Sequence, residues 1–124
     1  MEDMTHSYES LHKEHHAWRK YLLEIRAKLN HRVEQVIEHQ NNAQKQEVIV
    51  ICKELVSRHQ LFSQEVENKL NSLTDIDGLM SQTKETHHIV SSELFLLNSR
   101  MRAGILEFDK GCERFRDDVK QLIK

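Results

Sequence analysis

Histidine is the residue type in this sequence whose abundance and spacing suggest chemistry. The chain has nine histidines among 124 residues. Neutral imidazole binds transition metals, and helical bundles build metal centres from His and Glu side chains on facing helices. Two Glu-x-x-His pairs, Glu9/His12 and Glu85/His88, each place a carboxylate and an imidazole on one face of a predicted helix. A metal centre is therefore one hypothesis for the function.

The predicted helix registers gather a set of candidate ligands at one end of the molecule. The set consists of His15, Glu65 and His87, with His12, His16 and His88 as additional candidate ligands. These residue types suit iron or zinc without strong selection between them. His15, His59 and His87 also fall on apolar seams, so we prefer a second interpretation, in which they are core histidines hydrogen-bonded to carboxylates or backbone. A third is a pH-sensing cluster, because His titrates at about pH 6.5.

The motifs of common catalytic sites are missing from the sequence. Cys52 and Cys112 are the only cysteines, and both lie on predicted core stripes, whereas a catalytic thiol is partly exposed beside a base. The sequence also has no Gly-rich phosphate loop, no paired-Cys zinc motif and no serine elbow. We therefore expect a protein that is not an enzyme.

Long helices must position these side chains. The chain has no proline and three glycines, and its apolar residues recur at steps of three and four, which is typical of helices with heptad-like seams. The pattern predicts one all-α domain over residues 1–124, with helices at about 5–40, 45–73 and 78–123. The predicted turns are the Asn-rich stretch 40–44 and the segment Thr74–Gly78. Short turns favour an antiparallel bundle of three helices.

These boundaries make the last helix longer than its neighbours, so its end should overhang the bundle. The overhanging segment still carries an apolar stripe, made of Phe108, Cys112, Phe115, Val119 and Leu122. An exposed stripe of this kind needs a cover. Either the chain kinks at Gly104 or Gly111 and the segment folds back as a short fourth helix, or the stripe is an interface between two copies of the chain.

Two segments resemble haemerythrin-like (HHE) helical bundles. In the segment Leu11–Leu23, His15 is followed by Trp18 and Leu22 at the family's spacing, and Leu55–Phe62, with His59, is similar to the family's second helix. The family binds a non-haem di-iron centre. Several of its motifs are missing here, including the glutamate four residues after His59, where Ser63 stands. The resemblance therefore implies a degenerate centre that retains at most His15, His59 and one of His87 and His88.

Charge and hydropathy narrow the classes of partner. Lysines and arginines number 18 against 20 acidic residues, and the two signs are interspersed, whereas nucleic-acid binders carry a basic face. No apolar run is long enough to span a membrane, and the N-terminal residues lack the features of a signal peptide. We expect a cytoplasmic protein that binds a protein partner or itself through its C-terminal helix. The alternative is a metal-binding, haemerythrin-like bundle holding iron or zinc.

Overall fold

The computed structural model describes residues 8–86 and 92–124 of the chain. It contains three helices: α1 (Tyr8–Asn42), α2 (Gln46–Thr86) and α3 (Ser92–Ile123). No strand occurs in these two ranges. The prediction of an all-α chain is therefore confirmed for the described residues.

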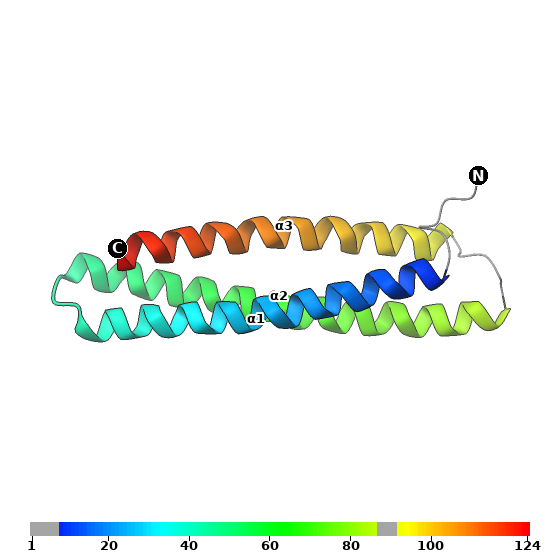
Figure 1. Ribbon diagram of the computed structural model, residues 1–124, viewed down its shortest axis with the longest axis horizontal. Helices are drawn as coiled ribbons and strands as arrows, with labels where there is room; N and C mark the ends of the chain where they lie inside the picture. Colours follow the sequence, from blue (N-terminus) through cyan, green and yellow to red (C-terminus); the bar gives the residue numbers. More distant parts are fainter. Residues whose placement is uncertain (1–7, 87–91) are drawn as a thin grey trace.

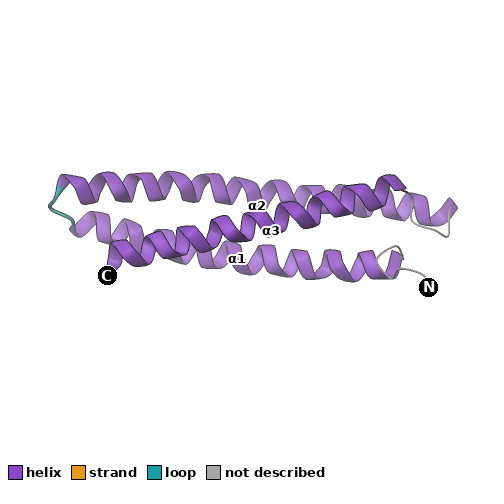
Figure 2. Ribbon diagram, turned by 90° about the horizontal axis from the view of Figure 1, so that it is seen from above, coloured by secondary structure: helices purple, strands orange, loops and turns teal. Residues whose placement is uncertain are grey.

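The three helices lie along one another and form a rod (Figure 1). A short turn at residues 43–45 joins α1 to α2, and α2 runs back along α1, so that His15 contacts Asp77 while Asn30 contacts His59. Seen from above, α3 extends along the α1–α2 pair (Figure 2). The hydroxyl of Tyr21 reaches Asp109 of α3. The starts of α1 and α3 thus lie at the same end of the rod as the last turns of α2.

The predicted turn at Thr74–Gly78 is wrong, because α2 continues through it to Thr86. The apolar seam also continues there: Leu73, Ile76 and Met80 are all buried. Burying a side chain such as Ile or Met stabilises by about 1.5–3 kcal/mol, whereas a glycine inside a helix costs about 1 kcal/mol relative to alanine. Two buried side chains therefore outweigh the single Gly78, and Asp77 lies within α2 instead of in a turn.

The longer α2 removes the predicted overhang of the C-terminal segment. Phe108, Cys112, Phe115 and Val119 are at most 4% exposed, and Leu122 packs against the same core. The expectation that this stripe lies uncovered is therefore wrong, because it rested on the misplaced turn. α3 is also continuous through Gly104 and Gly111. Among the described residues, no fourth helix is seen.

The core consists of two clusters along the rod. The larger one joins all three helices around Leu22, Val66 and Phe115. There, the ring of Phe62 packs edge-on against Phe108 and Phe115, with centroids 5.9 and 5.4 Å away. The smaller cluster surrounds the start of α1, and its buried members are Tyr8, Leu11, Ile76, Met80 and Leu94. A group of polar side chains lies near this smaller cluster.

Candidate functional site

His15 is the centre of a buried polar network that joins all three helices. Its side chain is fully buried. The ring atom Nδ1 lies 2.6 Å from Asp77 Oδ1 on α2, and Nε2 lies 2.5 Å from Asn98 Oδ1 on α3. One turn further along α1, Trp18 stacks on the imidazole at a centroid distance of 5.5 Å. Both ring nitrogens of His15 are therefore engaged by neighbouring helices.

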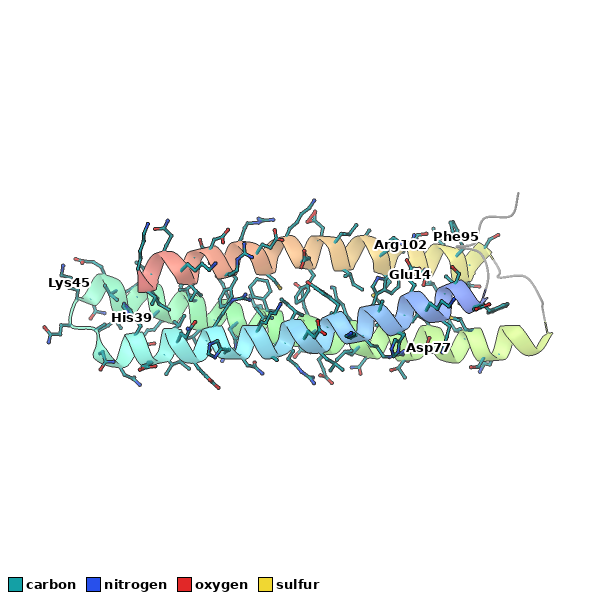
Figure 3. All side chains as sticks on the ribbon, viewed as in Figure 1. Glu14, His39, Lys45, Asp77, Phe95 and Arg102 are labelled. Atoms are coloured by element: carbon teal, nitrogen blue, oxygen red, sulfur yellow. The ribbon has the colours of Figure 1, made fainter. Side chains whose placement is uncertain are left out.

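The network continues on both sides of His15 to an arginine. Asn98 is 1% exposed, and its Nδ2 donates to Glu14 Oε1 over 2.7 Å. Arg102 donates to both oxygens of Glu14 over 2.8 Å. On the other side, Arg19 donates to Oδ2 of Asp77. Figure 3 shows Glu14, Asp77 and Arg102 at the same end of the rod.

The spacing of residues along α1 explains how one helix reaches both neighbours. His15 occupies the buried seam, in register with Leu11 and Leu22. Glu14, one position earlier, faces α3, and Arg19, one turn later, faces α2. Residues three and four apart share a face of a helix, so Trp18 lies on the same face of α1 as His15. The guanidinium carbon of Arg102 lies over the ring of Trp18, 6.0 Å from the ring centroid.

The two carboxylates of the network are held in their charged form. Partial burial alone would raise the pKa of Asp77, but hydrogen bonds from His15 and Arg19 outweigh it and lower that pKa below its usual value. Burial likewise acts to raise the pKa of Glu14, and the hydrogen bonds from Arg102 and Asn98 reverse the effect, so that pKa is lowered too. At neutral pH, both carboxylates therefore accept hydrogen bonds and donate none.

The structure does not bring the predicted metal ligands together. Glu65 pairs with Lys69 at 3.2 Å, and it lies about 18 Å from Asp77 along the axis of α2 at the usual rise per residue. His12 and His16 are exposed, and His87 and His88 lie outside the described residues. Within the described ranges, no group of three or more His, Cys, Asp or Glu side chains could hold a metal ion. His15 is hydrogen-bonded in the core, as the second interpretation predicts.

His59 has a different environment from His15. Its Nε2 lies 2.9 Å from Asn30 Oδ1 and 3.4 Å from Ser63 Oγ. Burial lowers the pKa of His59, because the charged form of the ring loses solvation there. The two seam histidines within the described residues therefore differ: His15 faces a carboxylate, and His59 faces neutral groups.

Sequence reasoning missed most of the network. Asp77 lies in the segment that the sequence predicts as a turn, and the sequence patterns do not single out Glu14, Arg19, Asn98 or Arg102. One signal was available at Asn98, which lies four residues after Leu94 and is therefore on the buried side of α3. An asparagine on a seam is a polar group that must find partners when it is buried. That signal predicts a polar contact in the core, but it does not identify His15 as the partner.

A second feature is an open groove between α2 and α3. Its volume is about 500 Å³, and its apolar lining comes from Ile76, Leu79, Leu97 and Met101. Leu79 is 43% exposed. Charged side chains of both signs line the groove as well: Lys69, Asp75 and Arg100.

Comparison with known proteins returned no match among protein-family models, curated proteins or solved structures. The haemerythrin-like resemblance therefore stays a prediction from short motifs. In the described part of the chain, no helix combines the length and the apolar character needed to cross a membrane.

Proposed function

We propose that the chain is a non-enzymatic, antiparallel three-helix bundle with heptad-like seams that associates with a second copy of itself through the groove between α2 and α3. The observation that carries the proposal is the partly exposed apolar lining of this groove, with Leu79 from α2 and Leu97 from α3. Contiguous apolar surface with a polar rim is typical of interaction sites. The sequence predicts association through the C-terminal helix, and in this proposal α3 contributes residues near its start instead of residues near its end.

The charges of the groove favour a second copy as the occupant. Asp75 lies on the α2 wall and Arg100 on the α3 wall. In a two-fold dimer the same patch faces itself, so that an acidic residue of one copy can meet a basic residue of the other. Helix-in-groove binding also needs an amphipathic helix with exposed apolar residues, and α2 and α3 provide them in Leu79 and Leu96.

The described cysteines are consistent with the cytoplasmic location that we propose. Cys52 and Cys112 are both free and buried, and reduced thiols are the rule in that compartment. Burial raises the pKa of the Cys112 thiol to about 12, which makes it a poor nucleophile. His15, the first ligand of the metal-binding alternative, uses both ring nitrogens for contacts with Asp77 and Asn98, which argues against that alternative.

Light scattering coupled to size exclusion tests the proposal on the wild type and two matched variants. Leu79→Glu places a charge in the groove, and Leu106→Glu places one on α3 at a side chain that is 61% exposed and does not line the groove. We expect a dimeric wild type, a dimeric Leu106→Glu variant and a monomeric Leu79→Glu variant, with all three helical by circular dichroism. A wild type that is monomeric up to high micromolar concentration overturns the proposal.

A further inference from the structure

Three polar contacts in a row link two carboxylates through the interior of the bundle. They run from Asp77 to His15 over 2.6 Å, from His15 to Asn98 over 2.5 Å, and from Asn98 to Glu14 over 2.7 Å. Distances this short require a hydrogen atom between the two heavy atoms in every contact, since two acceptors repel each other. The row therefore needs three hydrogens.

Counting the available donors shows which group supplies them. Ionised carboxylates only accept, so Asp77 and Glu14 contribute none. The amide of Asn98 donates at its Nδ2 end, toward Glu14, and accepts at Oδ1. A neutral imidazole has one N–H, which brings the total to two, whereas an imidazolium has two and completes the three contacts. The row is complete only when His15 is protonated on both nitrogens.

The alternatives fail at one contact each. Turning the Asn98 amide around would place its oxygen against the carboxylate of Glu14. Protonation of a carboxylate instead is disfavoured, because a positively charged arginine donates to each one. Arg19 donates to Asp77, and Arg102 donates to both oxygens of Glu14. The lowered pKa values of Asp77 and Glu14 agree with this assignment.

We propose that His15 is a buried imidazolium and acts as a pH-sensitive latch that fastens α1 to α2 and α3 at this end of the bundle. The groups that face it are Glu14 and Arg19 on α1, Asp77 on α2, and Asn98 and Arg102 on α3. When rising pH removes a proton from the ring, one acceptor faces another and a contact between helices is lost. This inference goes beyond the proposed association and does not depend on it.

The latch lies where the apolar core is smallest. The cluster around Tyr8, Leu11 and Leu94 is the smaller of the two in the bundle, and the network lies beside it. The larger cluster contains no such row and should stay closed when His15 loses its proton. We therefore expect a local loosening of one end, with faster amide hydrogen exchange at the start of α1 than around Phe115.

Nitrogen-15 NMR of the imidazole rings tests the charge directly. We expect the two ring nitrogens of His15 to show the similar chemical shifts of an imidazolium at pH 7.5. A His15→Gln variant assigns the signal, and Asn98→Leu should change it without deleting it. If either ring nitrogen of His15 shows the chemical shift of an unprotonated nitrogen, the proposal is overturned.

Urea unfolding between about pH 6 and pH 8, which brackets the titration of an unfolded histidine, tests the consequence. The folded wild type should hold more protons than the unfolded chain, so its folding constant should fall as pH rises, by at most about tenfold per pH unit for one proton. Asp77→Asn can donate an N–H to Nδ1, so a neutral His15 then completes the row and the fall should vanish. His16→Gln should behave like the wild type. If the folding constants of the wild type and of Asp77→Asn fall equally as the pH rises, the proposal is overturned.

Discussion

The two ends of this rod are built on the same three helices, but different forces hold them. At the end where α1 and α3 begin, His15, Asp77 and Asn98 join the helices by directed hydrogen bonds. In the other half, Phe62, Phe108 and Phe115 join them by ring packing. The helical period is the same in both halves, so the difference lies in which side chains occupy the seam.

The comparison separates stability from specificity. A hydrogen bond contributes about 0.5–1.5 kcal/mol net, and pairs that are partly exposed, such as Arg102 with Glu14, contribute little after screening. Burying one aromatic ring contributes about 1.5–3 kcal/mol. One buried ring of the aromatic half therefore contributes more stability than one hydrogen bond of the polar end. The polar end fixes which residues of the three helices lie level, because each donor needs one particular acceptor.

The largest effect is expected from Phe115→Ala in the aromatic half. Phe115 is fully buried, packs against Phe62, and has the guanidinium of Arg58 over its ring at 5.5 Å. Removing the ring leaves a cavity, so we expect a loss of about 3–5 kcal/mol in the free energy of unfolding. Urea denaturation measures it, with Leu61→Ala, at a side chain 69% exposed, as a control within about 0.5 kcal/mol of wild type. A loss no larger than that of Leu61→Ala would contradict the burial of Phe115.

An intermediate effect is expected from Asn98→Leu in the polar end. Leucine has a similar volume but offers no acceptor to His15 Nε2 and no donor to Glu14. Because a buried donor is left without a partner, we expect a loss of about 1–3 kcal/mol, again from urea denaturation. Asn71→Leu, at an exposed position of α2, is the matched control. An Asn98→Leu variant as stable as wild type would show that the network contributes specificity without net stability.

The apolar period was enough to predict the helices but not where α2 ends. Leu73, Ile76 and Met80 continue the seam of α2, yet the local signal of Asp77 and Gly78 suggested a turn. Local turn propensity and tertiary burial conflicted there, and burial prevailed because Gly78 costs less than two exposed apolar side chains would. That one boundary also produced the predicted overhang at Phe108, since the register of α3 depends on it.

The site was only partly predictable for a related reason. His15 was visible as a polar residue on a seam, and the preference for a hydrogen-bonded core histidine was correct. Its partners were not visible, because Asp77 comes from α2 and Asn98 from α3, and their levels depend on the misplaced turn. With α2 extended by two turns beyond Asp77, the three residues become neighbours.

The smallest effect is expected from replacing one glycine in each half with alanine, and it tests the corrected boundary. A Cβ at Gly78, beside Asp77, would meet no atom within 4 Å, whereas a Cβ at Gly111 would lie 3.3 Å from Phe62 Cε1. Alanine is favoured over glycine inside a helix by about 1 kcal/mol, so Gly78→Ala should raise the free energy of unfolding by about 0.5–1 kcal/mol. Gly111→Ala should gain less, because the ring of Phe62 must shift. Thermal and urea unfolding of both variants measure the difference. If Gly78 were in a turn with a left-handed backbone, alanine would destabilise the chain there, so the sign of this one change distinguishes a continuous α2 from the turn expected from the sequence.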